Sequence, residues 1–512
     1  FQAEDGIRDR SPSRGLGDVY KRQVIESIEQ MVKSIYSSLQ DKDFARSSID
    51  EVLTSVLGKN APQVSQVAEY VCSSIYPNLM STTDEIDNLI EGLEGKFIPA
   101  GPSGAPTRGM PNVLPTGRNF YSVDPKSLPS PAAWEVGKNL GDSLLQKYLD
   151  DEGDYPEMVG IVVWGTSAMR THGDDIAQIL YLLGVKPVWQ QESRRVVGIE
   201  AIDLKELGRP RIDVVMTLSG IFRDLLPLQT KMLAEAAYKA AVADEDPLKN
   251  FVRANVLDYM ARTNSDIETA ALRIFSNAEG AYGSNVNQLV DSSSFDEEDE
   301  LADAYEARKS FAYGRDGKPS QNQKLLKNVL SKVELAYQNL ESVELGITTV
   351  DHYFDTLGGI SKAVSRAREG QAIDVYISDH TRGNGKVRTL ADQVSLETRS
   401  RSLNPKFYES LLDHGAEGVR QLEAQVTNTL GWSATTGKVE PWVYQRISET
   451  FVLDEEMRNR ISDLNPTASS RMANRLLEAN DRSYWNPDPE TIAALQDAAD
   501  TLEDRMEGIA AQ

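Results

Sequence analysis

The sequence predicts an α/β protein of several domains, in which a mainly parallel sheet unit has extensive helical regions before and after it. Residues 158–225 carry the evidence for the sheet. Met158–Trp164 is a short continuous apolar run, which is typical of a strand that is buried on both faces. A second such run, Ile212–Thr217, leads into a helical pattern from about Arg223. Strands that alternate with helices in this way predict parallel pairing.

A helix is expected between these two strands. Apolar residues recur at helical spacing in residues 176–183. The acidic pair Asp174-Asp175 suits the positive N-terminus of a helix, and Gly184 stands where a helix ends. Two further strand patterns, at 186–189 and 196–202, are expected to join the same unit.

The turns after the two apolar runs indicate a binding site. Open α/β sheets bind ligands in the crevice beyond the carboxyl ends of their strands. Gly165 and Gly220 stand at two such ends. The predicted pocket is lined by Trp164, Thr166, Arg170, His172, Ser219 and Arg223. The alternative is that the two glycines only make tight turns.

The rest of the chain divides by composition and periodicity. The expected segments are a helical segment (24–98), a Pro/Gly-rich connector (99–131), an α/β domain (132–265), a mixed α/β domain (266–429) and a C-terminal helical domain (430–512). Residues 1–23 resemble a translated sequencing-adaptor artefact, so we expect them to be disordered and the natural protein to continue upstream of Val24.

Four details of the later segments are also predicted. Residues 325–340 have the pattern of one amphipathic helix, and Asp374–Ile377 reads as a buried strand that ends at Ser378-Asp379. Residues 431–437 read as a loop. The acidic run Asp296–Glu300 is either a Mg²⁺ site or the first turn of a helix, and the helix is favoured because apolar residues at helical spacing follow at once.

Composition excludes several classes of function. The chain has 512 residues and a net charge of −24, which argues against general nucleic-acid binding. No apolar run approaches the roughly 20 residues of a membrane helix. Cys72 is the only cysteine, which fits a reducing, cytoplasmic setting. The four histidines have no metal-ligand spacing, and no GxxxxGK[ST] motif occurs, so any ATP should be bound by another chain.

Many long blocks, in a fixed order, resemble the large-subunit family of the magnesium and cobalt chelatases between about residues 85 and 510. They include VLPTGRNFYSVDPKSLPSPAAW (113–134), VVWGT (162–166), GDDIAQIL (173–180), SGIFRDL (219–225), RIFSNAEGAYGSNVN (273–287), VDHYFDTLGGIS (350–361) and LNPKFYESLLDHGAEGVR (403–420). SAMRTHGDD (167–175) is nearer the cobalt enzymes, whereas NTLGWSATTGKVEPWVY (428–444) is similar to the magnesium enzymes of bacteriochlorophyll synthesis. Magnesium is therefore favoured.

The resemblance implies a porphyrin-binding subunit of a ligase that inserts the substrate Mg²⁺ into protoporphyrin IX for chlorophyll or bacteriochlorophyll biosynthesis. It further implies two smaller partner subunits that form the ATPase motor, and as another partner the next enzyme, a Mg-protoporphyrin methyltransferase. The alternatives are a cobalt chelatase of cobalamin biosynthesis, a tetrapyrrole sensor without catalysis and an assembly scaffold. The family's HFGTHGSLE-like block is absent, so this chain alone is expected to be inactive.

Metallation needs a base for two pyrrole protons, oxygen ligands for Mg²⁺, cations for two propionates and an apolar slot for the ring. The candidates for proton and metal handling are Asp351 with His352, or Asp379 and Glu397. The candidates for substrate binding are Trp164, Thr166, Arg223, Arg253, Tyr282, Arg388, Arg399 and Trp432. Three alternatives stay open: Asp351 and His352 cap a helix, Arg223 and Arg253 are internal ion-pair partners, and Trp432 belongs to the core. Metal ligands are not assigned.

Overall fold

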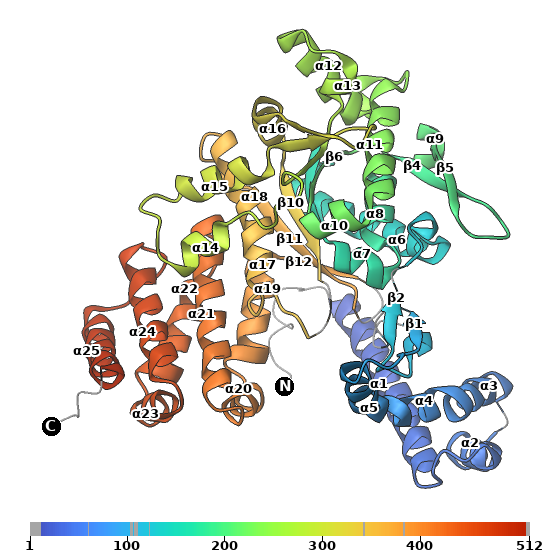
Figure 1. The fold of residues 1–512 in the computed structure, drawn as a ribbon, viewed down its shortest axis with the longest axis vertical. Helices are drawn as coiled ribbons and strands as arrows, with labels where there is room; N and C mark the ends of the chain where they lie inside the picture. The colour runs from blue at the N-terminus through green and yellow to red at the C-terminus, as the bar shows by residue number, and fades with distance from the viewer. Residues whose placement is uncertain are drawn as a thin grey trace. The chain divides into compact units, whose positions relative to one another are not determined.

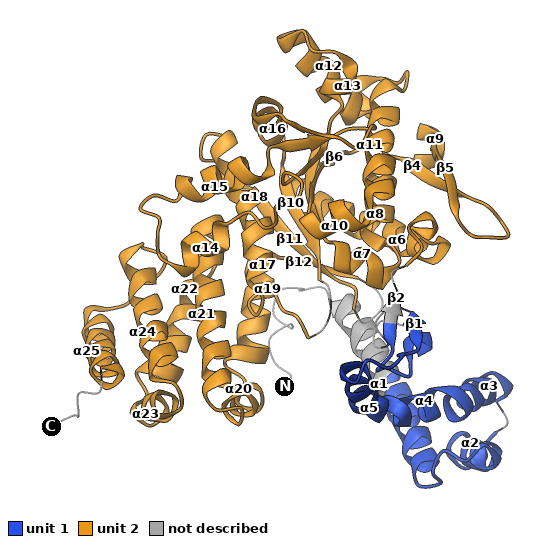
Figure 2. Cartoon of the chain, viewed as in Figure 1, with its two compact units in different colours: residues 1–122 blue, residues 123–512 orange. Residues whose placement is uncertain are grey.

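The chain forms two compact units, residues 1–122 and residues 123–512 (Figure 2). The computed structural model describes residues 12–59, 61–102, 106, 111–121, 123–340, 342, 344–381 and 385–507. For residues 12–23, 25, 26, 120 and 121 it describes the backbone alone. None of the described helices is both long and apolar enough to cross a membrane.

The first unit is helical, as the periodicity of residues 24–93 predicts. Its elements are α1 (Pro12–Gln40), α2 (Ile49–Leu57), α3 (Pro62–Tyr70), α4 (Tyr76–Met80), α5 (Asp84–Leu93) and the short parallel strands β1 (Ala100–Pro102) and β2 (Asn119–Tyr121). A small apolar core contains Leu39, Val52 and Leu53. Helix α1 begins within the segment 1–23 that is predicted to be disordered, and residues 1–11 lie outside the described residues.

The second unit is built on an eight-stranded sheet with the order β12-β11-β10-β3-β6-β7-β8-β9. The strands are β3 (Met158–Val163), β6 (Asp213–Leu218), β7 (Ile274–Ser276), β8 (Phe311–Tyr313), β9 (Pro319–Gln321), β10 (Leu335–Asn339), β11 (Asp374–Asp379) and β12 (Lys386–Thr389). The pairs from β11 to β7 are parallel, whereas β12, β8 and β9 pair antiparallel. The predicted parallel α/β unit is therefore confirmed.

Helices cover both faces of this sheet. Figure 1 shows α6, α8 and α11 on one side of the strands and α15, α16 and α18 on the other. The helices are α6 (Pro131–Glu152), α7 (Gly165–Thr171), α8 (Asp174–Leu182), α9 (Leu204–Leu207), α10 (Gly220–Leu225), α11 (Pro227–Val242), α12 (Phe251–Thr263), α13 (Ile267–Ala270), α14 (Val286–Asp291), α15 (Asp299–Lys309), α16 (Gln323–Leu330), α17 (Asp351–Tyr353) and α18 (Gly359–Ala367). Every residue of β3, β6 and β10 is buried as a result.

The chain after β12 is helical. Its helices are α19 (Leu390–Glu397), α20 (Pro405–Leu412), α21 (Ala416–Thr436), α22 (Pro441–Ile447), α23 (Glu455–Leu464), α24 (Pro466–Asp481) and α25 (Pro489–Met506). One apolar core runs from the sheet into these helices. The predicted boundaries near residues 265 and 429 fall within this single compact unit.

Two local predictions are wrong, and a third is right about two strands but not about the sheet to which they belong. Residues 185–201 form an antiparallel hairpin, β4 (Val185–Trp189) with β5 (Val196–Ala201), outside the main sheet, because residues 190–195 are too few for a parallel crossover. The predicted helix 325–340 ends at Leu330, since residues 335–339 pair with strands on both sides as β10. Residues 431–436 are the last turns of α21 and not a loop, and only Gly437 turns left-handed to end the helix.

The acidic run Asp296–Glu300 leads into a helix, as favoured. Helix α15 begins at Asp299, and Glu300 Oε1 accepts hydrogen bonds of 3.1 Å from the backbone N–H groups of Asp296 and Glu297. This carboxylate satisfies donors that have no partner inside the helix. Asp299 and Glu300 therefore begin α15, and Asp296–Glu298 lead into it.

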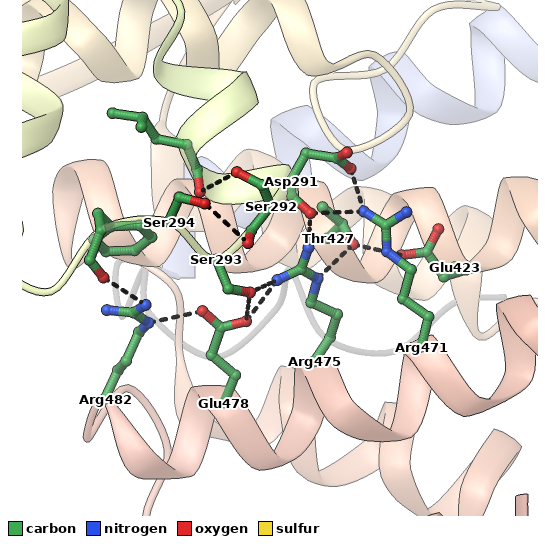
Figure 3. A network of polar contacts seen from close by, with 12 residues as sticks. Asp291, Ser292, Ser293, Ser294, Glu423, Thr427, Arg471, Arg475, Glu478 and Arg482 are labelled. Atoms are coloured by element: carbon green, nitrogen blue, oxygen red, sulfur yellow. Dashed lines mark hydrogen bonds and ion pairs between the residues drawn. The ribbon is translucent and has the colours of Figure 1, made fainter. Parts of the chain in front are cut away.

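A polar network fastens the segment after α14 to helices α21 and α24 (Figure 3). Arg475 of α24 is 4% exposed and donates to the Asp291 carbonyl, to Ser293 Oγ and to Glu478 Oε2, the last at 2.6 Å. Burial pushes the pKa of Glu478 up, but hydrogen bonds from Arg482, Ser293 and Arg475 outweigh burial and hold that pKa below its usual range. Glu478 thus stabilises the fold at neutral pH, and this contribution is lost as the pH falls through its lowered pKa.

The substitution Arg475→Ala is expected to lower the free energy of unfolding by about 3 kcal/mol, because it removes the hydrogen bonds that this buried guanidinium donates to the Asp291 carbonyl, Ser293 and Glu478. The urea midpoint of the second unit measures this change. Arg420→Ala is the matched control, since Arg420 pairs with Glu417 on an exposed helix face and should leave the midpoint unchanged. An Arg475→Ala midpoint equal to that of the unsubstituted protein would contradict the network's role.

Candidate functional site

The carboxyl ends of the parallel strands lie along one edge of the sheet, which we call the carboxyl edge. In sheet order the strands end at Asp379 (β11), Asn339 (β10), Val163 (β3), Leu218 (β6) and Ser276 (β7). Neighbouring strands are about 5 Å apart, so the ends of β11 and β3, with β10 between them, are about 10 Å apart. The ends of β3 and β6 therefore share one edge, as the sequence predicts, and the structure adds Asp379 of β11, which the sequence pattern assigns to a separate domain.

An aromatic and a titratable group meet at the end of β3. The ring centre of Trp164 lies 6.3 Å from that of His352 with the rings nearly perpendicular, and 4.8 Å from that of Tyr353. His352 Nδ1 lies 3.3 Å from Asp351 Oδ1, and the His352 side chain is 69% exposed. Because Nδ1 faces the carboxylate, Nε2 is the nitrogen that can exchange a proton with a ligand. The structure thus brings Trp164, Asp351 and His352 together.

The loop after β7 and the first turn of α14 hold this group in position. Asn287 Nδ2 donates to Asp351 Oδ2 at 2.6 Å. Asp355, in the π-helical turn Phe354–Gly358, is 2% exposed and accepts from the backbone N–H of Ser284 at 2.9 Å and from that of Asn287 at 3.1 Å. π-Helical turns often occur at functional sites. Sequence reasoning missed Asp355 and Asn287, because their partners are far away along the chain.

Asp379 presents an ionised carboxylate at the end of β11. Its Oδ1 accepts from Thr381 Oγ1 at 2.7 Å, and its Oδ2 lies 3.5 Å from Arg388 Nη1. Burial raises the pKa of Asp379, but the Thr381 hydrogen bonds and the Arg388 charge outweigh burial, so this pKa is lower than usual. The structure therefore pairs two of the predicted site residues, Asp379 and Arg388.

Two histidines near this strand end are largely enclosed by protein. His380 Nε2 lies 3.4 Å from Asp174 Oδ2, which ties the end of β11 to the start of α8. His172 precedes the same helix with a left-handed backbone, and burial lowers its pKa more than the Asp174 charge raises it. Sequence reasoning missed the His380 contact, because the spacing of histidines along the chain says nothing about a carboxylate on another element.

The arginine that follows β6 forms its hydrogen bonds within the protein. Arg223 is 5% exposed and donates to the carbonyls of Asn277 at 3.0 Å and Ala278 at 2.7 Å and to Asp224 at 2.7 Å. Its guanidinium also stands 5.7 Å from the ring centre of Tyr282. This geometry agrees with the alternative that Arg223 is an internal partner. Tyr282 itself is 52% exposed, and its hydroxyl donates to Asp224 at 2.7 Å.

The glycines at these strand ends allow close packing rather than tight turns. Neither Gly165 nor Gly220 has a positive φ. A Cβ on Gly165 would lie 2.8 Å from the backbone nitrogen of Phe222, and one on Gly220 would lie 2.4 Å from the ring of Tyr282. Ser219 Oγ accepts from the backbone N–H of Gly165 at 3.2 Å and from that of Phe222 at 3.1 Å. The ends of β3 and β6 are therefore held in direct contact.

A buried lysine lies behind this edge. Lys309 Nζ donates to Asn277 Oδ1 at 2.8 Å and to the Leu218 carbonyl at 3.3 Å. Burial lowers the pKa of Lys309 to about 8. A helix that ends in Arg308-Lys309 reads as a solvated helix end in the sequence, so pattern alone does not reveal this lysine.

Glu397 and Trp432 lie inside the protein. Glu397 is 3% exposed, and its carboxylate accepts from the backbone N–H groups of Ile347 at 3.0 Å and Thr348 at 2.9 Å. Trp432 is fully buried and donates from Nε1 to the Ile347 carbonyl at 2.9 Å. Both side chains hold the loop before α17, which agrees with the alternative that Trp432 belongs to the core.

The remaining predicted residues are dispersed. Arg253 lies on α12 and donates to the Ala243 carbonyl at 2.7 Å. The same helix contacts the amino end of β6, where Asn255 donates to Asp213 at 3.0 Å. Arg399 is exposed and stands 4.6 Å from the ring centre of Trp442. Thr166 is exposed in the first turn of α7. Arg253 thus lies at the edge opposite the carboxyl edge.

The carboxyl edge combines a base, a carboxylate and an aromatic ring. His352 can take up a proton at Nε2, Asp379 can offer oxygen to a hard cation, and Trp164 can contact an apolar ligand. Arg223, Arg253 and Glu397, by contrast, are already hydrogen-bonded within the protein. This arrangement suits proton transfer and cation handling beside a flat apolar ligand.

Comparison with known proteins identifies the family. The CobN/Magnesium Chelatase family matches residues 7–492. The chain is 63% identical over 435 residues to the H subunit of the magnesium chelatase of Rhodobacter capsulatus, covering 85% of this chain and 36% of that protein. It is 38% identical over 411 residues to the aerobic cobaltochelatase subunit CobN of Sinorhizobium, covering 79% of this chain and 32% of that protein.

The solved structures include a close match. The catalytic subunit of cobaltochelatase from Mycobacterium tuberculosis superposes with a TM-score of 0.89 at 39% identity, over 94% of this chain and 41% of that one. The chain therefore spans about a third of the length of the curated relatives named above. The sequence match and the shared fold lead to one conclusion: the chain belongs to the CobN/magnesium chelatase family.

Proposed function

We propose that this chain acts as part of the porphyrin-binding large subunit of a magnesium chelatase, which inserts the substrate Mg²⁺ into protoporphyrin IX. The observation that carries the proposal is the 63% identity to the H subunit of a magnesium chelatase, against 38% to the cobaltochelatase subunit CobN. Because the chain has no phosphate-binding GxxxxGK[ST] motif, ATP hydrolysis is assigned to two smaller partner subunits. A Mg-protoporphyrin methyltransferase that accepts the product is a further proposed partner.

In this proposal the carboxyl edge handles the protons and the metal. His352, oriented by Asp351, takes pyrrole protons at Nε2, and Trp164 contacts the face or edge of the macrocycle. Asp379 replaces water in the Mg²⁺ shell, because Mg²⁺ prefers carboxylate oxygen and its loss of water is slow without such a ligand. The low pKa of Asp379 supports this role, since only the ionised form binds the cation well.

Among the arginines, the described contacts favour Arg388 and Arg399 for the propionates. Arg388 is only loosely bonded, with Nη1 3.5 Å from Asp379 and 3.3 Å from Gln393, and Arg399 is exposed on the turn after α19. A guanidinium with available donors can bind a carboxylate through two hydrogen bonds. Arg223 and Arg253 are less suited, because internal carbonyls and carboxylates already take up their donors.

The proposed metal can be tested with the full-length large subunit, both smaller subunits and ATP. The expected result is insertion of Mg²⁺ into protoporphyrin IX, followed by the fluorescence shift of the metallated ring. Mg²⁺ and Co²⁺ are selected by geometry and ligand set, so each metal is assayed with its own tetrapyrrole. Insertion of Co²⁺ into a corrinoid ring without any magnesium activity would contradict the proposal.

In the same reconstituted enzyme, His352→Ala is expected to lower the insertion rate by about 10²-fold, which is the usual contribution of a general base. The thermal midpoint should not change, because the imidazole is largely exposed. Glu397→Ala is the comparison variant, since it removes a buried carboxylate from two backbone N–H groups and should lower the thermal midpoint. An unchanged insertion rate in His352→Ala would exclude the base role.

A further inference from the structure

A groove separate from the carboxyl edge lies between helix α11, the hairpin β4–β5 and the 3₁₀ turn Pro125–Ser127. Its volume is about 860 Å³. Figure 1 shows the hairpin beside α11, and both strands of the hairpin contact this helix. The proposed metallation chemistry uses none of the residues that line the groove. The composition of the groove therefore needs another explanation.

Apolar side chains form the floor of the groove. Leu228 and Met232 are one turn apart on α11, and Val197 and Ile199 come from β5. Leu228 is 46% exposed and Val197 is 65% exposed. Exposed apolar side chains that gather in one concave place mark an interaction site, whereas scattered ones need no explanation. A partner with apolar anchors would remove this surface from water.

Basic side chains surround the floor. The lining contains five cations, Lys126, Arg195, Lys231, Lys239 and Arg315, and one acid, Glu235. Lys231, Glu235 and Lys239 follow Leu228 on the same stripe of α11, at the spacing of successive helical turns. The chain as a whole carries a net charge of −24, so this local excess of positive charge is the reverse of its general character. Such a place attracts an acidic partner and repels most basic ones.

Two of these cations are available to a partner. Arg195 pairs with Asp124 at 2.7 Å, and Arg315 lies 2.8 Å from Glu268 and also contacts Glu235. Lys239 lies 3.6 Å from Glu235. Lys126 and Lys231 have no ion-pair partner among the residues that the structure describes, and both are exposed. Lys126 lies on the 3₁₀ turn and Lys231 on α11, and both elements line the groove beside its apolar side chains.

We propose that this groove binds an acidic amphipathic segment of a partner protein. Apolar side chains of that segment would contact Leu228, Met232 and Val197, while its carboxylates would pair with Lys126 and Lys231. Apolar anchors supply most of the affinity in such a mode, and the charges supply selectivity and rate. A nucleic acid would use the cations but not the apolar floor. Binding in this groove does not depend on which metal the enzyme inserts.

The probe is a synthetic acidic peptide of about 16 residues with leucines at helical spacing and glutamates elsewhere, a pattern that lays one apolar face into a groove. Binding to the full-length chain is measured by fluorescence anisotropy. We expect saturable binding that weakens as salt rises, because the pairing charges are exposed. A peptide of the same pattern with lysines for the glutamates should not bind.

Substitutions locate the binding to the groove. Lys231→Glu and Val197→Asp are each expected to raise the Kd about tenfold, since one reverses a charge and the other removes an apolar contact. Both residues are exposed, so the fold should be retained, and circular dichroism checks this. Lys406→Glu, on the exposed face of α20, is the matched control and should leave the Kd unchanged.

Three results would overturn the proposal. The first is the absence of saturable binding to the unsubstituted chain at millimolar peptide. The second is a Kd that responds to Lys406→Glu as much as to Lys231→Glu, which would indicate diffuse attraction between charges. The third is tighter binding of a single-stranded oligonucleotide of equal charge, with no effect of Val197→Asp, which would indicate an anion site without apolar anchors.

Discussion

The structure depends on the burial of three neighbouring parallel strands, β10, β3 and β6, on both of their faces. Every residue of these strands is buried, so their side chains can only pack. The charged and amide side chains of these strands, Asp213, Gln338 and Asn339, stand near the strand ends. Parallel pairing also brings all the carboxyl ends to the same edge. Trp164 and Asp379 share this edge for that reason.

The two edges of the sheet differ in what their polar groups do. At the amino edge, Arg273 donates to the fully buried Asp213 at 2.9 Å, and Asn255 donates to the same carboxylate. These groups saturate one another and leave no capacity for a ligand. At the carboxyl edge, His352 and Asp379 keep exposed or loosely bonded atoms. The difference in hydrogen-bond saturation, more than residue type, separates the structural edge from the candidate site.

Local patterns in the sequence predict the strands 158–163 and 213–218, because burial on both faces leaves a continuous apolar run. The same patterns place Trp164 at the end of the first strand. The contact of Trp164 with His352 and the anchoring of Ser284 by Asp355 join distant segments, so no local pattern reveals them. Residues 431–437 were misread for a related reason. Gly431 allows the Phe354 ring to pack closely against α21, because a Cβ on residue 431 would lie 2.6 Å from that ring. In a sequence, a glycine needed for close packing cannot be told from a glycine needed for a turn.

Amide hydrogen exchange of the full-length large subunit, with and without protoporphyrin IX, tests most directly whether the proposed porphyrin ligand lies at the carboxyl edge. A bound ligand should slow exchange in the backbone that it covers or stabilises. We expect protection in residues 164–172, in residues 351–355 and in the described residues that flank the β11–β12 turn (379–381 and 385–389), with no change around Arg253 on the opposite edge. Protection confined to other segments, with these three unchanged at saturating porphyrin, would contradict the claim.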